Sequence, residues 1–140
     1  NINKNNQLFV DGKTIQINEL KQIAINFIDN GGGLDINKQH CDWCNGEKNK
    51  SSSDHPSKAI ISIKTDRLTN YETYITTLDI LNAAYTHLRN KLSVKLYNRN
   101  YESLLEDYKK SNHSDKEIQE KIKLIREKYP LLLSDAEINN

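Results

Sequence analysis

Residues 59–92 read AIISIKTDRLTNYETYITTLDILNAAYTHLRNKL, a short apolar stretch followed by a long amphipathic one. The β-branched residues of Ala59 to Ile63 predict a central strand of a sheet. From Tyr71 to Leu92, apolar side chains recur at the i, i+3, i+4 and i+7 spacing of a helix, over about five turns. Thr69 and Glu72 stand in the spacing of a capping box and predict the start of this helix. One face of the helix is therefore expected to pack against the sheet.

A β-hairpin and a shorter helix are predicted before this stretch. Leu8 to Val10 and Thr14 to Ile17 are short alternating runs, and Asp11-Gly12 between them readily takes the positive φ angles of a tight turn. Asn18 is the expected N-cap of a helix whose apolar residues repeat at helical spacing. Gly31 to Gly33 is expected to end that helix, because glycine adopts the left-handed C-cap conformation at little cost.

More helix and a last strand are predicted after this stretch. The helical extension, residues 93–129, carries a second capping box at Ser114 and Glu117, and Pro130 stops it. The segment from Leu131 to Ile138 is the expected last strand, with four residues expected to face inward: Leu131, Leu133, Ala136 and Ile138. This order of elements predicts an α+β fold with two layers, a small mixed β-sheet and helices packed on one face.

The segment Gly31 to Ser57 is expected to be a long flexible loop insertion. It is rich in Asn, Lys, Ser and Gly, and little in it besides Leu34, Ile36 and Trp43 is suited to burial. Because so few apolar groups lie here, the loop is predicted to be dispensable for folding. A chain of this length builds one core, so we predict a single domain over residues 1–140.

Two cysteines near the middle of this loop leave three interpretations open. Cys41 and Cys44 could bind zinc together with His40 and His55, but the spacing matches closed structural zinc sites poorly. A thioredoxin-like redox pair should open a helix after a strand, and this pair lies in a predicted loop. A local structural disulfide between Cys41 and Cys44 is favoured, with Trp43 beside it as a partly exposed aromatic residue.

Composition bears on the partners and on the origin of the chain. Lys and Arg number 20 and Asp and Glu number 19, so no global positive field attracts nucleic acid, and no nucleic-acid partner is expected. No apolar run approaches the roughly 20 residues that a membrane-spanning helix needs. The sequence contains no methionine, even at position 1, so we expect it to be a piece of a longer product that had a signal peptide or a membrane anchor upstream.

Two segments carry a family resemblance. The first is Leu8 to Gly12 followed by the helix from Asn18, and the second is Ile61 to Asp66 followed by a tyrosine and a Leu-Asp pair. Together they resemble the periplasmic domain of the ExbD/TolR family of biopolymer-transport proteins, being ExbD-like. In that family a strand ends in an acidic residue, a tyrosine follows at the start of a helix, and an apolar-Asp pair lies in the helix; the matching residues are Asp66, Tyr71, Leu78 and Asp79.

The resemblance implies a function in energy coupling and no enzyme activity. It implies a periplasmic domain of a single-pass inner-membrane protein, usually a homodimer, whose N-terminal transmembrane helix couples to an ExbB/TolQ-like proton channel subunit. The implied partner is a TonB-like transducer for outer-membrane transport in the ExbD branch, or peptidoglycan in the TolR branch. The proton-handling aspartate of the family lies in the transmembrane helix, so no residue here inherits that role. No cofactor and no metal are expected.

The expected place for partner binding is an unpaired strand edge, which an extended peptide can complete. The candidate edges are the strand Leu131 to Ile138 and the first strands near Asn1 and Leu8. An acid/base pair of Asp66 and Asp79 is not expected, because a carboxylate at a strand-to-helix turn ordinarily satisfies backbone groups. The alternative from another functional class is a secreted thiol-binding or metal-binding domain centred on the two cysteines and two histidines of the loop: Cys41, Cys44, His40 and His55.

Overall fold

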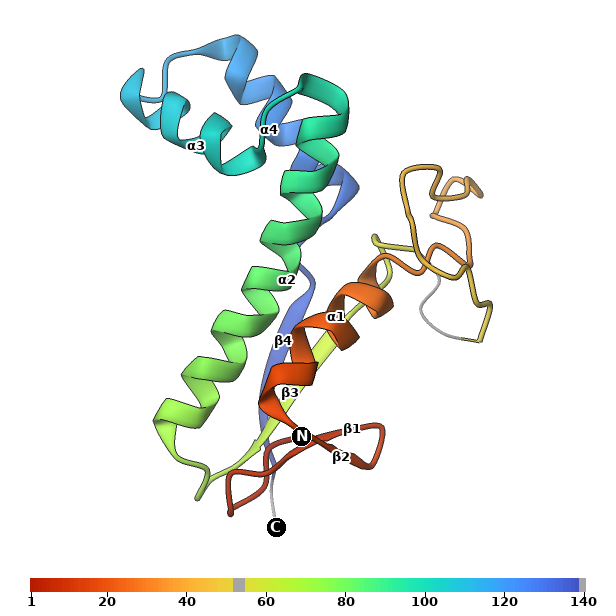
Figure 1. Cartoon of the computed structure of the whole chain (residues 1–140), viewed down its shortest axis with the longest axis vertical. Helices are drawn as coiled ribbons and strands as arrows, with labels where there is room; N and C mark the ends of the chain where they lie inside the picture. Colours follow the sequence, from red (N-terminus) through yellow and green to blue (C-terminus); the bar gives the residue numbers. More distant parts are fainter. Residues whose placement is uncertain (52–54, 139–140) are drawn as a thin grey trace.

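A computed structural model describes residues 1–51 and 55–138, without the side chains of residues 136–138. The described elements are, in chain order, β1 (Leu8–Val10), β2 (Lys13–Ile15), the 3-10 helix η1 (Ile17–Glu19), α1 (Leu20–Ile28), β3 (Ile61–Asp66), α2 (Tyr71–Tyr97), α3 (Tyr101–Lys110), α4 (Lys116–Lys128) and β4 (Leu133–Ile138). The predicted α+β fold is confirmed (Figure 1). Within the described ranges, no helix has the length and apolar character that crossing a membrane requires.

The strands form a mixed arrangement centred on β3. β4 pairs with β3 in parallel, in a register that sets Ile61 opposite Leu133. On the other side of β3, Ile2 forms a parallel bridge to Thr65 and an antiparallel bridge to Leu8, which links β3 to the β1–β2 hairpin. The strand begins at Ile61 and reaches Asp66, later than the predicted Ala59 to Ile63, because its pairing with β4 extends to the Asp66–Ile138 pair.

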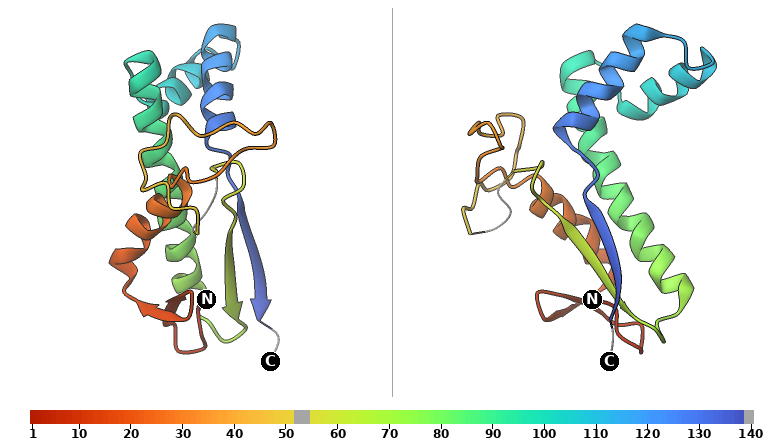
Figure 2. Two further views of the ribbon diagram at one scale, coloured as in Figure 1. Left: turned by 90° about the vertical axis from the view of Figure 1, so that its right-hand side faces the viewer. Right: turned by 180° about the vertical axis from the view of Figure 1, so that it is seen from behind.

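Helices cover one face of β3 and β4, as predicted. Ile63 is buried beneath the helices, whereas its neighbours Ser62 and Lys64 are exposed on the opposite face. Figure 2 shows the two paired strands with α1 and α2 beside them. The core is continuous from the hairpin to the far end of α2 and includes Ile28 and Tyr85. Two helices on one side leave the other side of the sheet open to solvent.

The sequence predicted the hairpin turn correctly but misplaced the N-caps of the helices. Asp11 and Gly12 have φ angles of 50° and 78°, so the predicted hairpin turn is confirmed. The first helix is preceded by η1, where the Glu19 carboxylate accepts from the Gln16 N–H at 2.8 Å, and Asn18 is not its cap. The cap of α2 is Asn70 rather than Thr69, whose hydroxyl donates instead to the Ile2 carbonyl oxygen.

The helical extension forms an arm at the end of α2. α3 and α4 pack on each other and on α2, and Figure 1 shows them at the end of α2 that lies away from the hairpin. Leu104 of α3 and Ile125 of α4 are fully buried in the shared core. The N-cap of α4 is Asp115, which accepts from the Ile118 N–H at 3.1 Å, in place of the predicted Ser114.

Candidate functional site

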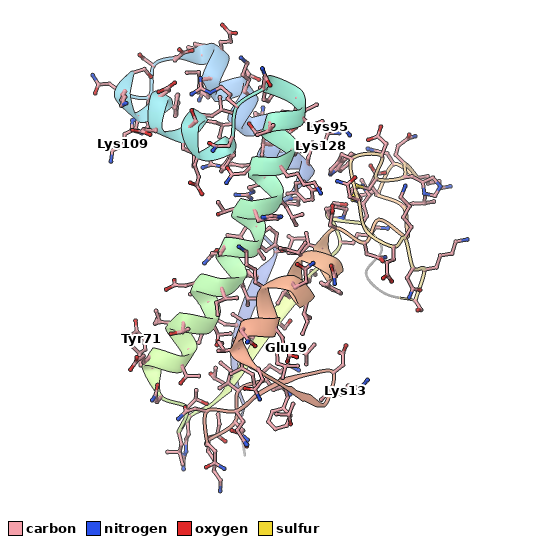
Figure 3. All side chains as sticks on the ribbon, in the orientation of Figure 1. Lys13, Glu19, Tyr71, Lys95, Lys109 and Lys128 are labelled. Carbon is pink, nitrogen blue, oxygen red and sulfur yellow. A yellow bond between two sulfur atoms is a disulfide. The ribbon has the colours of Figure 1, made fainter. Side chains whose placement is uncertain are left out.

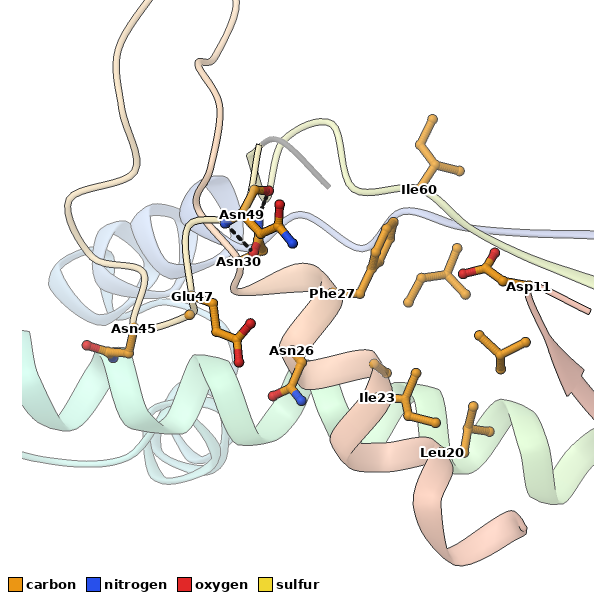
Figure 4. A pocket seen from close by; sticks show the side chains of 14 residues that line it. Asp11, Leu20, Ile23, Asn26, Phe27, Asn30, Asn45, Glu47, Asn49 and Ile60 are labelled. Carbon is orange, nitrogen blue, oxygen red and sulfur yellow. Dashed lines mark hydrogen bonds between the residues drawn. The ribbon is translucent and has the colours of Figure 1, made fainter. Parts of the chain in front are cut away.

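An apolar groove lies beside the N-terminal half of β3. It has a volume of about 560 Å³ and is bounded by α1, the tip of the β1–β2 hairpin and residues 45–49. Figure 4 shows Ile23 and Phe27 of α1 on its floor, with Ile60 and Asp11 at its sides. Ile60 is 59% exposed, and Ile23 and Phe27 are only partly buried. The groove is of the size that proteins use to hold a small ligand or a few side chains.

The backbone of β3 is open along this groove. The Ile61 N–H donates to Leu132 O at 2.9 Å, so the backbone groups of Ile61 point toward β4. Backbone groups of successive strand residues point to opposite sides, so Ser62 and Lys64 point away from β4. Ile2 donates to Lys64 O at 2.8 Å on that side, and no hydrogen bond is recorded for Ser62 within the described part of the chain. A second cavity of about 340 Å³ lies at this gap, and Ser62 lines it.

The wall of the groove is fixed by hydrogen bonds to the end of α1. The Asn30 side chain donates to Asn49 O at 2.8 Å and accepts from Asn49 N at 3.0 Å (Figure 4). Gly46 N donates to Asp29 O at 2.9 Å, and a Cβ on Gly46 would lie 2.3 Å from that oxygen. Only glycine permits this close approach of two backbones. The groove is therefore built into the fold.

The segment predicted to be a loop with little to bury is in fact packed on the domain. Its described residues, 31–51 and 55–57, form no helix or strand, but Cys41, Cys44 and His55 are buried. Ile36, which had been a candidate for burial, is 89% exposed. The prediction of a loop with little to bury counted only large apolar residues. In the folded segment, cysteine, glycine and asparagine residues fill the interior in their place.

The predicted disulfide is present. Cys41 and Cys44 are joined, with an S–S distance of 2.04 Å, and both are buried. His40 is exposed, whereas His55 is buried with its ring 5.3 Å from that of Trp43. Trp43 is partly exposed, as expected. With both sulfur atoms in the disulfide, neither cysteine offers a thiolate, and no group of three or more potential metal-binding side chains occurs in the described ranges.

A buried polar cluster ties the end of α1 to the end of α4, just before the chain enters β4. The Tyr129 hydroxyl donates to Asp29 Oδ1 at 2.6 Å, and both residues are buried. Burial, together with this hydrogen bond, raises the pKa of Tyr129 far above that of a free tyrosine. Arg89 of α2 donates to the Tyr129 carbonyl oxygen through Nε at 3.0 Å and Nη2 at 2.8 Å. The segment that leads into β4 is therefore held from two sides.

The outer edge of β4 is the second open edge. Among the described strands, only β3 pairs with β4. The backbone N–H and C=O groups of the even-numbered residues from Leu132 onward point toward β3. The backbone groups of Leu133, Asp135 and Glu137 therefore point outward. Leu133 is partly buried on the core, as predicted. Leu131 is 50% exposed, so its predicted inward orientation is wrong; strand alternation begins only at Leu133. The side chains of Ala136 and Ile138 lie outside the description.

The residues of the family-like motif adopt distinct positions. Asp66 ends β3 and accepts from the Leu68 N–H at 2.9 Å, as expected for a turn carboxylate. Tyr71 begins α2 and is 77% exposed, so it does not enter the core (Figure 3). Leu78 packs on the core, and Asp79 is exposed on α2. The motif residues therefore shape the turn from strand to helix and take separate positions on it.

Tyr74 connects this helix to the β4 edge. Its hydroxyl donates to Asp135 of β4, and this hydrogen bond raises the pKa of Tyr74 above its ordinary value. Sequence reasoning missed this contact and the whole groove beside β3. Asn45-Gly46, a typical turn dipeptide, was the one local signal that pointed to a structured wall. Comparison with family models, curated proteins and solved structures found no match to this chain.

Proposed function

We propose that this chain is the periplasmic energy-coupling domain of an ExbD/TolR-type subunit in a motor driven by the proton motive force. In this proposal a membrane anchor upstream of Asn1 couples to an ExbB/TolQ-like channel subunit. The domain passes the anchor's motion to a TonB-like transducer that serves outer-membrane transport. The domain acts by binding and by transmitting force, without catalysis.

The observation that carries the proposal is the outer edge of β4, which pairs with no other described strand and is connected to α2 by hydrogen bonds. An unpaired strand edge offers backbone donors and acceptors that an extended partner segment completes, and such pairing resists a pull along the strand. The segment that leads into β4 is held at Tyr129, and β4 itself is held at Asp135 by Tyr74. A load applied to β4 therefore reaches α2 and the core directly.

Hydrogen exchange with a synthetic peptide from the periplasmic stretch of a TonB-like transducer tests the proposal. We expect new protection at the outward amides of Leu133, Asp135 and Glu137, and little change at Ser134, whose amide already faces β3. Glu137→Pro removes one outward donor without removing a bond to β3, so it should abolish the new protection, whereas Glu137→Ala should keep it. Protection confined to residues 41–44 would instead contradict the coupling function.

A further inference from the structure

The groove lies along the edge of β3 opposite to β4, and its surface has the features of a binding site. Its apolar lining is accessible in part, because Ile60 at its side is 59% exposed and Ile23 and Phe27 on its floor are only partly buried. Exposed apolar surface that gathers in a preformed groove usually marks a site of binding. Next to the floor, the backbone of Ser62 points into the gap between β3 and the hairpin, where none of the described residues forms a hydrogen bond with it.

The charged residues that line the groove are acidic, although the wall also carries the exposed Lys48, which is not among the lining residues. Of the 14 lining residues, Asp11 and Glu47 are acidic and none is Lys or Arg. Neither carboxylate belongs to an ion pair recorded for the described residues, and both side chains are exposed. Asp11 comes from the hairpin tip and Glu47 from the fixed wall, so the two lie on different elements at the rim (Figure 4). A ligand that fills the apolar floor therefore meets negative charge at its flanks.

We propose that this groove binds an extended peptide segment in which a large apolar residue is flanked by Lys or Arg. The apolar side chain packs on Ile23 and Phe27 at the floor and on Ile60 at the side, and the peptide backbone pairs with Ser62. The cationic side chains face Asp11 and Glu47. This inference does not rest on the motor function, because it concerns the opposite edge of β3 and requires only the groove's shape and charge.

Because the wall is already fixed, little conformational entropy is lost when a peptide binds. Residues 45–49 are already held by the Asn30–Asn49 pair and by the contact of Gly46 with Asp29, so little ordering is needed when a ligand arrives. The disulfide immediately before the wall limits its motion further. The groove thus differs from the other candidate binding surface, the outer edge of β4, which no wall of described residues faces.

Fluorescence anisotropy with three labelled ten-residue peptides tests the proposal. All three peptides alternate an apolar with a polar residue, and the polar residue is Lys, Glu or Ser. We expect the Lys peptide to bind at least tenfold more tightly than the Glu peptide, with the Ser peptide between them. In NMR spectra, the amides of Ser62, Val10 and Phe27 should shift most. Equal affinity for the three peptides would refute charge selection, and shifts confined to β4 would refute the site.

Two pairs of variants separate the contributions. Asp11→Asn with Glu47→Gln should weaken the Lys peptide about fivefold, as expected for two exposed ion pairs, and leave the Ser peptide unchanged. The control, Asp79→Asn with Glu72→Gln on α2, should change neither. Ile60→Ser should weaken all three peptides, and Ile36→Ser, which alters an exposed isoleucine outside the groove, should weaken none. Equal effects of variant and control would overturn the assignment.

A second copy of the chain is the competing occupant of the groove. Sedimentation velocity of the protein alone distinguishes it from a peptide partner. We expect Asp11→Asn with Glu47→Gln to leave the sedimentation coefficient unchanged at every concentration. A dimer that dissociates in this variant, and not in the α2 control, would show that the groove is a self-association surface and would overturn the proposal. Failure of transducer peptides to bind β4 would leave this result unaffected.

Discussion

The buried contact between Tyr129 and Asp29 gives the sharpest prediction about stability. Tyr129→Phe removes the hydroxyl that donates to Asp29 Oδ1 at 2.6 Å and leaves a buried carboxyl group with one of its hydrogen bonds missing. Hydrogen bonds of this kind contribute about 1.5–3 kcal/mol, so we expect the free energy of unfolding to fall by about 2 kcal/mol. For a domain of this size, the melting temperature should fall by about 5–10 °C.

Urea unfolding followed by circular dichroism measures this change. The control is Tyr97→Phe, because Tyr97 is partly buried and its hydroxyl forms no hydrogen bond with the described residues. Since the folded-state pKa of Tyr129 is raised, the unfolded state ionises first, and stability should fall as the pH rises above about 10. Tyr129→Phe should reduce that fall. A loss below about 0.5 kcal/mol, equal to that of the control, would refute the role given to this contact.

Three further predictions concern the packed segment between α1 and β3. Cys41→Ser with Cys44→Ser should lower the free energy of unfolding by about 2 kcal/mol while the protein still folds, because the disulfide closes a very short loop; calorimetry that shows no folded state would contradict this. Asn30→Ala, compared with the exposed Asn26→Ala, should cost about 1–3 kcal/mol in urea unfolding, because only Asn30 bonds to the wall. Burial lowers the pKa of His55, so its contribution to stability should be lost as the pH falls below about 6.5, and melting curves of His55→Gln should depend less on pH in that range.

Much of the fold could be predicted from the sequence because its signals are local and periodic. The repeat of apolar residues from Tyr71 onward predicted α2, and Asp11-Gly12 predicted the hairpin turn. The caps were misplaced by one residue or more because Ser, Thr, Asn and Asp cap helices almost equally well. Tertiary contacts decided between them: the Thr69 hydroxyl was drawn to Ile2, which left Asn70 as the cap of α2.

The groove could not be predicted from local patterns. Its floor comes from α1, its sides from the hairpin and β3, and its wall from residues 45–49, which are far apart in the sequence. The wall is held by asparagine side chains and by a glycine with no room for a Cβ, and such polar anchors resemble an ordinary loop in sequence. In the sequence, Ile60 is one apolar residue within the predicted strand, and its exposure gains meaning only from its position beside Phe27 in the groove.

Photo-crosslinking in energised cells tests the central claim, force transmission through β4, most directly. A photoreactive residue in place of the exposed Ser134, in the full-length protein, should crosslink to the periplasmic segment of an energy transducer. The same residue in place of Lys123 on α4 serves as the control and should not. The account predicts that the Ser134 crosslink changes when a protonophore collapses the proton motive force. A crosslink that is absent, or that is unchanged by the protonophore, would contradict it.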